Sequence, residues 1–304
     1  MSQKSALVTG GGGFIGRAVC KLLQRKGYRA LPTELRPDPE TLGGPLPEIA
    51  EIPCDIRRAT HLWTLFQSEP IDSMIHLAAV LPTMAQQRPL LATQTNITGT
   101  MNLLEMARQF KLRRVVFASS LSVYGTYPVE EEVSETHRAA PEDVYGATKL
   151  CGEQAGGVYR DRFGTSFVSL RIGRVVGPGA VSATSPWRAE IFDKLRSGEQ
   201  VEISLPYAGT ERLLVAHVDD VAAMLVSLHE AEKPAHSIYN AVCESVTVAE
   251  LKAQVESLNP NVRVKLGEAQ ATGNPRRLDS KRFAEEFGLR FQSIEEHLKR
   301  AAGK

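Results

Sequence analysis

Two residues four positions apart, Tyr145 and Lys149, have the side chains that an acid/base pair requires. On a helix this spacing places both side chains on one face. A phenol has an ordinary pKa of about 10 and is a poor base at neutral pH. A neighbouring ammonium group and a helix N-terminus both stabilise the phenolate, so the pair can take a proton from an alcohol. Two ordinary surface residues of a helix are the alternative, and the rest of the chain must decide.

Hydroxyl groups precede this pair, at the end of an apolar run that predicts a buried strand. The run covers residues 113–118, and Ser119, Ser120 and Ser122 come after it. A hydroxyl group at this strand end can hold a substrate oxygen while the proton moves. His76 stands at the end of another predicted strand, where it is either a base or a packed histidine.

A glycine-rich turn near the N-terminus is a candidate phosphate site. Residues 6–8 predict a buried strand, and residues 14–26 have apolar side chains at helical spacing. Between them, Gly10, Gly13 and Gly16 have the spacing G-x-x-G-x-x-G. Unpaired N–H groups and the helix dipole attract phosphate at such a point. An ordinary tight connection is the alternative that this turn alone leaves open.

Glu34 ends the second predicted strand, residues 28–34, 24 positions after Gly10. A carboxylate there accepts hydrogen bonds from the adenosine ribose and repels a 2′-phosphate, which favours NAD over NADP. Arg36 argues in the opposite direction because a guanidinium pairs with phosphate. A solvated charge at a strand end is the further alternative for Glu34. Pro32 predicts an edge position or an early end for this strand.

Strands and helices alternate along the first half of the chain, which predicts a doubly wound parallel α/β sheet, the Rossmann fold. The strands are expected at residues 6–8, 28–34, 51–54, 71–77, 113–118 and 166–172, and the helices at 14–26, 57–67, 96–110 and 145–162. The second half is irregular, with helices expected at 187–196 and 218–230 and short strands at 201–203, 213–215 and 262–264. We therefore expect an NAD-binding domain over residues 1–170. Residues 171–304 are expected to form mainly a smaller C-terminal substrate lobe, interleaved with the last elements of that domain.

Composition narrows the classes of partner. The 304 residues carry a formal net charge of +1, which gives no electrostatic reason to expect nucleic acid or an anionic membrane surface. No apolar run approaches the roughly 18 residues that a membrane span needs, and the N-terminus has too little apolar length for a signal peptide. The four cysteines form no C-x-x-C pair and the seven histidines have no metal-ligand spacing. We expect free thiols, no metal and a cytoplasmic protein.

Together these residues resemble the extended branch of the short-chain dehydrogenase/reductase (SDR) superfamily, which includes NAD-dependent epimerases and dehydratases. The motifs run in order along most of the chain: T-G-G-G-G-F-I-G at 9–16, D-I at 55–56, H-L-A-A at 76–79, Asn96 with Gly99-Thr100, S-S-L-S-V-Y-G at 119–125 and Y-G-A-T-K at 145–149. The resemblance implies that Tyr145 is the catalytic acid/base. It also implies that Lys149 binds the nicotinamide ribose and lowers the pKa of the tyrosine. Ser120 orients the substrate oxygen, with Ser119 and Ser122 as alternatives.

The resemblance also implies a cofactor site, in which Asp55 and Ile56 flank the adenine and Ala78 and Ala79 lie near the pyrophosphate and ribose. The expected NAD-binding residues are Gly10, Gly13, Phe14, Ile15, Gly16, Glu34, Asp55, Ile56, Leu77, Ala78, Ala79, Asn96, Tyr145 and Lys149. Members of this superfamily often dimerise through the helices predicted at 96–110 and 145–162, so a homodimer is expected.

The substrate site is indicated less sharply. Segments 182–192 and 205–220 resemble SDR-type L-threonine dehydrogenases, and small sugar-acid dehydrogenases share a comparable layout. Arg174 stands where nucleotide-sugar enzymes typically carry an asparagine that meets the diphosphate. Either Arg174 or Arg212 can hold a carboxylate through a bidentate pair; a diphosphate contact and a structural ion pair are the alternatives. The expected substrate-binding residues are Ser122, Arg174, Trp187 and Arg212.

The expected reaction is hydride transfer between NAD and a secondary alcohol or ketone of a small hydroxy, amino or sugar acid, with Tyr145 as acid/base. A nucleotide-sugar epimerase or dehydratase that keeps NAD tightly bound is the first alternative. A non-catalytic NAD(P)-binding regulatory protein is the second, and the intact Ser120, Tyr145 and Lys149 argue against it.

Overall fold

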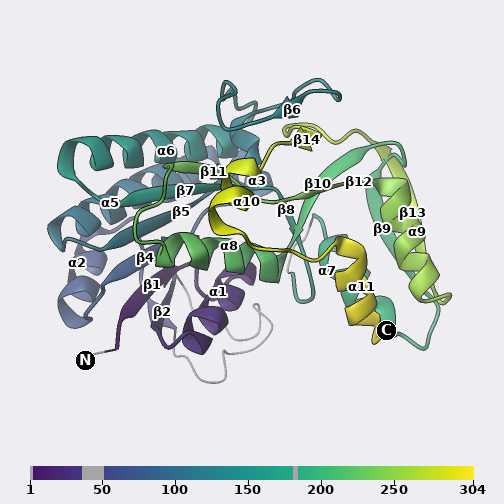
Figure 1. Ribbon diagram of the computed structural model, residues 1–304, viewed down its shortest axis with the longest axis horizontal. Coiled ribbons are helices and arrows are strands. Elements are labelled where there is room, and N and C mark those ends of the chain that lie inside the picture. The colour runs from purple at the N-terminus through teal and green to yellow at the C-terminus, as the bar shows by residue number, and fades with distance from the viewer. Residues whose placement is uncertain (1–2, 36–50, 181–183) are drawn as a thin grey trace.

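A seven-stranded parallel sheet forms the centre of the computed structural model, which describes residues 3–35, 51–180 and 184–304. The strand order is β11-β7-β5-β4-β1-β2-β3, and every pair is parallel (Figure 1). The strands are β1 (Ser5–Thr9), β2 (Arg29–Glu34), β3 (Ile52–Pro53), β4 (Ser73–His76), β5 (Arg114–Ser120), β7 (Phe167–Ile172) and β11 (Ile238–Asn240). This order confirms the predicted doubly wound fold. Arg36, which bears on the choice of cofactor, lies outside the described residues.

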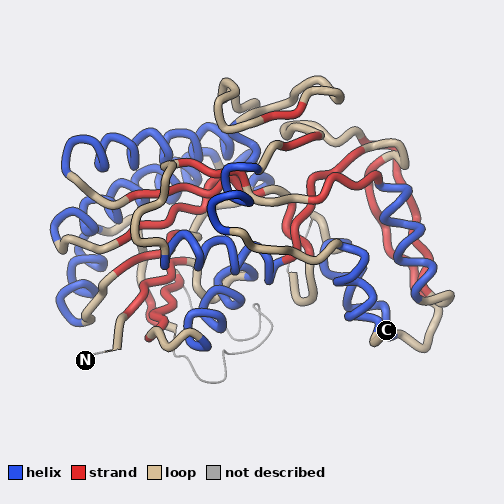
Figure 2. Tube along the Cα trace, viewed as in Figure 1, coloured by secondary structure: helices blue, strands red, loops and turns tan. Residues whose placement is uncertain are grey.

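Helices cover both faces of this sheet, as Figure 2 shows in colour. One layer contains α1 (Phe14–Arg25) and α8 (Val218–Glu230), and the other contains α2 (Ala59–Ser68), α5 (Gly99–Gln109) and α6 (Val144–Phe163). Strand β1 shows why two layers are needed, because all five of its residues are buried. Ala6 and Val8 enter the core beneath α1 and α8, whereas Leu7 enters the core beneath α2 and α5.

The prediction of an edge position for the strand with Pro32 is only partly right. Strand β2 lies inside the sheet, between β1 and β3. Its outer neighbour β3 pairs only with Thr33 and Glu34, so no strand of the described chain pairs with Pro32 on that side. A proline is therefore tolerated there.

Two short helices, two helical turns and one long helix surround the carboxyl ends of these strands. Helices α3 (Pro82–Gln87) and α4 (Pro89–Ala92) lead into the π-helical turn η1 (Thr93–Thr98), and the 3₁₀ turn η2 (Leu121–Val123) follows β5. Helix α6 starts after Asp143, whose carboxylate accepts a 2.6 Å hydrogen bond from the Gly146 N–H. It ends at Gly164 in the left-handed conformation.

The C-terminal half of the chain forms a smaller group of sheets. Strands β8 (Arg174–Val176), β10 (Arg212–His217) and β12 (Glu244–Thr247) form a three-stranded sheet, β9 (Val201–Tyr207) pairs with β13 (Val262–Ala269), and β6 (Glu132–Val133) pairs with β14 (Arg277–Leu278). Their helices are α7 (Trp187–Asp193) with the 3₁₀ turn η3 (Lys194–Arg196), α9 (Val248–Leu258), α10 (Lys281–Phe287) and α11 (Ile294–Ala302). Strands β9 and β10 are longer than the sequence pattern predicts.

The chain crosses between the two parts more than once. Strand β7 continues past residue 170, where the predicted boundary falls. Strand β11 and helix α8 come from the second half, yet β11 pairs with β7 and α8 packs on the seven-stranded sheet. Among the described residues, no helix is both long and apolar enough to cross a membrane.

Candidate active site

The glycine turn lies at the carboxyl end of β1, between the ends of β2 and β4. Gly10 has a φ of +69°, and a Cβ built on it would lie 2.9 Å from the Ala78 backbone nitrogen. A Cβ on Gly16 would overlap the Gly10 carbonyl oxygen. Neither position tolerates a side chain, because the turn is pressed against the end of β4 and the start of α1. This is the point at which the strand order reverses, where open α/β sheets bind their ligands.

Helix α1 begins at this turn with an uncapped N-terminus. Its N-cap residue is Gly13, and no side chain of the described chain caps it. The first turn of α1 contains no acidic residue. The N–H groups at this end, beginning with Phe14 and Ile15, therefore suit a bound phosphate, and the residues present fit the pyrophosphate of a dinucleotide.

Glu34 ends β2, and Glu51 comes just before β3, close enough for the two charges to interact. Burial raises the pKa of Glu34, and the negative charge of Glu51 raises it further. The Glu34 carboxylate accepts a 3.1 Å hydrogen bond from the Leu35 N–H. Arg17, on the first turn of α1, has a buried Nη1 atom without a hydrogen-bond partner among the described residues.

Asp55 and Ile56 follow β3 and are fixed by their neighbours. Both oxygens of Asp55 accept hydrogen bonds from Arg57, at 2.8 and 2.7 Å, and this lowers the pKa of Asp55. The Ile56 side chain packs so closely on α5 that a Cβ on Gly99 would lie 2.7 Å from it. The amide of Asn102 donates to the Ile56 carbonyl at 3.0 Å.

His76, the last residue of β4, and Asn96 both have hydrogen-bond partners within the protein. His76 is buried between Thr9 and Thr100, at 2.7 and 3.0 Å from their hydroxyl oxygens, and burial lowers its pKa to about 3. Such an imidazole is neutral and packed, which answers the question that the sequence left open.

The Asn96 side chain lies in the π-helical turn η1 and holds the loop after β4. Its amide oxygen accepts from the Val80 N–H at 2.7 Å, and its amide nitrogen donates to the Val80 carbonyl and to the Thr148 hydroxyl, both at 3.0 Å. All three interactions fix the loop that follows Ala78 and Ala79 against α6. This geometry gives Asn96 a positioning part rather than a free amide for the cofactor.

The structure brings Ser120, Tyr145 and Lys149 together at the ends of β5 and α6. Burial raises the pKa of the Tyr145 phenol to about 12, and a hydrogen bond with Ser120 acts in the opposite direction. The Ser120 hydroxyl also donates to the Ser122 hydroxyl at 3.1 Å and accepts from the Ser122 N–H. The hydroxyl of Ser119 is buried and has no partner within the described chain. Of the three serines, Ser120 is the one that meets Tyr145.

Lys149 is held by a backbone carbonyl rather than by the tyrosine oxygen. Its ammonium donates to the Ala118 carbonyl at 2.7 Å and lies 5.7 Å from the centre of the Tyr145 ring. Burial lowers the pKa of Lys149 to about 7. Burial of the phenol sets the direction of its shift in the described chain, and the effect of Lys149 on the tyrosine pKa stays a prediction.

On the opposite side of Tyr145, the C-terminal lobe presents arginines. The guanidinium of Arg174, on β8, lies 5.6 Å from the centre of the Tyr207 ring. Trp187 was expected to contact the substrate. It is only 1% exposed and packs in the lobe's core, so its ring is not open to a ligand. Its neighbour Arg188, which sequence analysis missed, has its guanidinium 6.0 Å from the centre of the Trp187 ring, and its charge interacts with the Tyr145 phenol. Burial and the positive charge of Arg174 lower the pKa of Arg188, and the phenols of Tyr207 and Tyr145 oppose this.

Arg212 lies away from this cluster. Val215 pairs with Arg174 in the register of β10 and β8, so these two side chains share one face of the sheet. Arg212 is three positions before Val215, and side chains alternate along a strand, so Arg212 projects from the opposite face. Its guanidinium donates to the Ser245 carbonyl at 3.0 Å. We therefore no longer assign Arg212 to the site of Tyr145.

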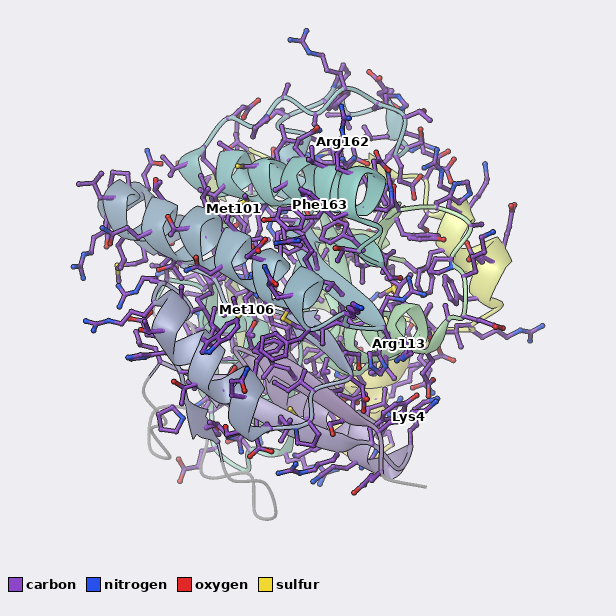
Figure 3. The ribbon with its side chains drawn as sticks, turned by 90° about the vertical axis from the view of Figure 1, so that its left-hand side faces the viewer. Lys4, Met101, Met106, Arg113, Arg162 and Phe163 are labelled. Atoms are coloured by element: carbon purple, nitrogen blue, oxygen red, sulfur yellow. The ribbon has the colours of Figure 1, made fainter. Side chains whose placement is uncertain are left out.

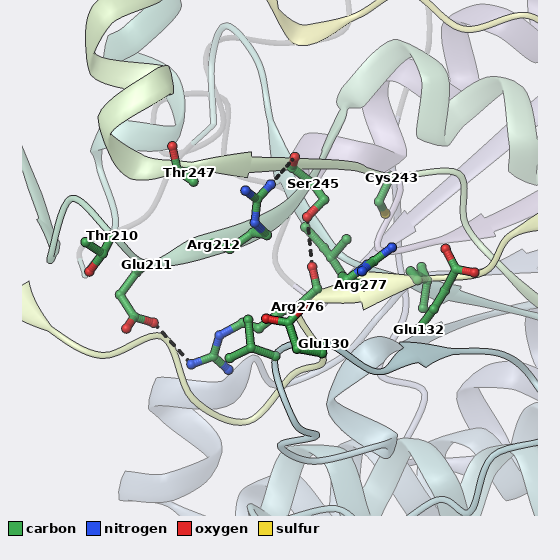
Figure 4. A pocket seen from close by; sticks show the side chains of 13 residues that line it. Glu130, Glu132, Thr210, Glu211, Arg212, Cys243, Ser245, Thr247, Arg276 and Arg277 are labelled. Atoms are coloured by element: carbon green, nitrogen blue, oxygen red, sulfur yellow. Dashed lines mark hydrogen bonds and ion pairs between the residues drawn. The ribbon is translucent and has the colours of Figure 1, made fainter.

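Arg212 lines a separate pocket of about 700 Å³ (Figure 4). An ion pair between Glu211 and Arg276, 3.1 Å long, closes one side of it. The lining residues are Val129, Glu130, Glu132, Thr210, Glu211, Arg212, Leu214, Cys243, Ser245, Thr247, Arg276, Arg277 and Leu278. Ser120, Tyr145 and Lys149 are not among them. No group of three or more His, Cys, Asp or Glu side chains in the described ranges is arranged to hold a metal ion.

A dinucleotide-binding sheet with a Ser-Tyr-Lys site at its carboxyl edge defines an NAD-dependent enzyme of the extended SDR class. The chain belongs to the NAD dependent epimerase/dehydratase family, whose model matches residues 6–241. This membership confirms the resemblance seen in the sequence and the expectation of an enzyme that acts by hydride transfer with NAD.

Individual relatives carry out several reactions. The chain is 27% identical to the mitochondrial L-threonine 3-dehydrogenase of Sus scrofa over 276 residues, which are 86% of this chain and 70% of that protein. It is 32% identical to the uronate dehydrogenase of Pseudomonas putida over 169 residues, 55% of this chain and 59% of that one. The structure of Thermus thermophilus UDP-glucose 4-epimerase in complex with NAD has the same fold, with a TM-score of 0.83 and 23% identity over 98% of both chains.

Proposed function

We propose that this protein is an NAD-dependent dehydrogenase that oxidises a secondary alcohol in a small polar acid, or reduces the corresponding ketone. The observation that carries this proposal is the guanidinium of Arg174, which lies 5.6 Å from the centre of the Tyr207 ring and acts on the same Arg188 charge as Tyr145 does. A guanidinium in a partly buried site binds a carboxylate strongly. The threonine and uronate dehydrogenases among the relatives support a small acid as the substrate.

In the proposed reaction Ser120 holds the hydroxyl oxygen of the substrate and Tyr145 accepts its proton. When bound, NAD supplies a two-electron acceptor for the hydride that leaves the same carbon, so the alcohol becomes a ketone and NAD becomes NADH. The ammonium of Lys149 would stabilise the phenolate and would hold the nicotinamide ribose. Ser122 supports Ser120 through their 3.1 Å hydrogen bond.

The cofactor site proposed for NAD combines the glycine turn with residues at three strand ends. Gly10, Gly13 and Gly16 leave room for the pyrophosphate beside the N–H groups of Phe14 and Ile15. Asp55 and Ile56 line the adenine side, and Leu77, Ala78 and Ala79 line the ribose side. Asn96 acts by fixing the loop after Ala79.

Glu34 and Glu51 support NAD over NADP, because two carboxylates repel a 2′-phosphate. We expect NAD to raise the melting temperature more than NADP at equal concentration, since the stabilisation by a ligand increases with its affinity for the folded state. Glu34→Gln should narrow the difference by a few degrees, measured by differential scanning fluorimetry. A larger shift with NADP in the wild type would contradict this preference.

Tyr145→Phe tests the mechanism. We expect it to lower kcat at least about 100-fold, because loss of a general acid/base typically costs that much, while NAD still binds. Tyr159→Phe is the matched control on the same helix. The Tyr159 hydroxyl lies 3.2 Å from Glu105 on α5, so this substitution should leave kcat unchanged. NADH formed from a panel of small acids is measured by absorbance. A nucleotide sugar converted without net NADH would instead establish the epimerase alternative.

We propose that the protein forms a homodimer through α5 and α6. Large apolar side chains are exposed on these helices: Met101 is 38% exposed, Val158 is 55% and Phe163 is 54%. Figure 3 faces this side of the molecule, with Met101 and Phe163 labelled. A symmetric pairing of the two helices would cover these side chains.

A further inference from the structure

Arg188 is a second guanidinium on the Tyr145 side of the lobe, and its place in α7 is fixed from both sides. Helix α7 starts at Trp187, whose ring packs in the core, and the next residue of a helix points about 100° away. The Arg188 carbonyl accepts a 3.0 Å hydrogen bond from the Gly177 N–H, just beyond the end of β8. This bond fixes α7 to the strand that carries Arg174.

Among the described residues, no carboxylate forms an ion pair with Arg188. Its Nε atom is buried and has no hydrogen-bond partner in the described part of the chain. The charged and titratable groups that act on it are Arg174 from β8, Tyr207 from β9 and Tyr145 from α6. A buried, unpaired charge is unfavourable, and two neighbouring guanidinium groups repel each other. An anion bound between the two guanidinium groups would pair with the buried charge and offset the repulsion between the arginines.

A positively charged site beside Tyr145 also acts against some ligands. In an amino acid the ammonium group is attached to the carbon next to the carboxylate. Binding an amino acid would therefore bring a third positive charge into the cluster. A nucleotide sugar places its diphosphate several atoms from the reacting carbon, whereas Arg188 lies close enough to Tyr145 for their charges to interact. The arrangement suits an acid group whose carboxyl carbon lies within one or two bonds of the carbon that carries the reacting hydroxyl.

We propose that Arg174 and Arg188 together bind the carboxylate of a hydroxy acid or sugar acid that carries no ammonium group, with the carboxyl carbon one or two bonds from the carbon whose hydroxyl meets Ser120 and Tyr145. This inference rests on the proposed dehydrogenase function and narrows its substrate class. It makes Arg188 the residue that selects hydroxy acids over amino acids.

A pair of substrates that differ only at one group tests the selection. Threonine and 2,3-dihydroxybutyrate have the same carbon chain, with an ammonium in one and a hydroxyl in the other. All stereoisomers of both are assayed with wild-type protein and NAD, beside four- to six-carbon aldonates and uronates. We expect kcat/KM for the best hydroxy acid to exceed that for threonine at least 100-fold.

Arg188→Gln should raise KM for that hydroxy acid at least 10-fold with a smaller change in kcat, and should reduce the preference over threonine by a similar factor. Arg188→Lys should restore part of the affinity. Arg212→Gln, on the opposite face of the sheet, is the matched control and should leave both constants unchanged. Melting temperatures of all variants identify loss of folding, and the ratio between two substrates is independent of the amount of folded enzyme.

The outcomes separate the two proposals. Threonine as the better substrate, or an unchanged ratio in Arg188→Gln, overturns the selection by Arg188 and keeps the dehydrogenase. Absence of NADH from every small acid, or conversion of a nucleotide sugar without net NADH, overturns both.

Discussion

At the level of single residues, Lys149 occupies a place that its charge disfavours. It is 3% exposed, and its ammonium donates to the Ala118 carbonyl at 2.7 Å. Burial lowers its pKa to about 7 from the ordinary 10.5. Between these two pKa values the unfolded chain binds more protons than the folded chain, so the free energy of unfolding rises with pH. The destabilisation by the buried ammonium is therefore fully present below about pH 7.

Replacing Lys149 by Met should therefore stabilise the folded chain while it impairs catalysis. We expect the free energy of unfolding to rise by about 2 kcal/mol at pH 6, after allowance for the lost hydrogen bond. The gain should shrink as the pH rises to 10, because the wild-type lysine then becomes neutral in the folded state at little cost. Urea unfolding at pH 6, 8 and 10 measures both effects. A gain that is equal at all three pH values would contradict an origin in the buried charge.

Residue types and spacing predicted part of the site and misplaced the rest, for definite reasons. Ser120 stands at a strand end, and Tyr145 and Lys149 share one face of the helix that comes next in the main fold. These two elements pack against each other, so the three side chains come together. Arg188 was missed because one helical position separates it from Trp187, and only the packing shows which of the two is buried. Arg212 was included because sequence alone does not set the register that turns it to the opposite face.

Among the elements, α6 positions both catalytic side chains, and it does so by lying very close to the sheet. A Cβ on Gly152 would lie 2.5 Å from the Phe117 ring, and one on Gly156 would overlap the Phe167 ring. One residue further on, Gly157 has no atom within 4 Å of such a Cβ. A buried ion pair at 2.6 Å, between Glu153 on α6 and Arg171 on β7, adds to this attachment.

Gly156→Ala and Gly157→Ala form a matched pair on this helix. We expect Gly156→Ala to lower the free energy of unfolding by about 1–3 kcal/mol, because the added methyl pushes α6 from β7. Gly157→Ala should raise it by about 0.5–1 kcal/mol, because alanine restricts the unfolded chain and meets no neighbour. Guanidinium unfolding of both variants measures the difference. The same sign for both substitutions would refute the close contact of α6 with β7.

The helix itself was predictable from its pattern, but the contrast between its two adjacent glycines was not. Residues 145–162 were expected to be helical, and α6 runs from Val144 to Phe163. Gly156 and Gly157 are the same residue type and differ only in that Gly156 faces the sheet and Gly157 does not. Periodicity is weak here because α6 is covered by the sheet on one side and carries apolar residues such as Val158 on the other.

At the scale of the whole molecule, the exposed apolar face of α5 and α6 predicts the oligomeric state. Phe163→Asp and Val158→Asp should shift the proposed dimer to a monomer, because each buries a charge in the interface. Leu289→Asp is the control, since Leu289 is 37% exposed and lies outside both helices. Light scattering coupled to size-exclusion chromatography gives the mass of each. A wild-type monomer, or a dimer that survives both substitutions, would disprove this interface.

The alternation of strands and helices predicted the fold class, but it did not predict the last strand of the main sheet. Strand β11 has only three residues, Ile238–Asn240, which is too short for a pattern to identify. It is recognisable only through its pairing with Ser169, Leu170 and Arg171 of β7.

The late position of β11 has a consequence for the order in which the protein can fold during synthesis. When the ribosome has made the first 172 residues, six strands of the sheet exist, and β7 is an uncovered edge rich in apolar side chains. Helix α8, which covers one face, follows about 50 residues later, and β11 later still. At typical translation rates of about 5–20 residues per second, the nascent chain exposes this edge for several seconds. We infer that the vulnerable species in the cell is this incomplete sheet, so chaperone binding should be strongest to nascent chains that end between β7 and β11.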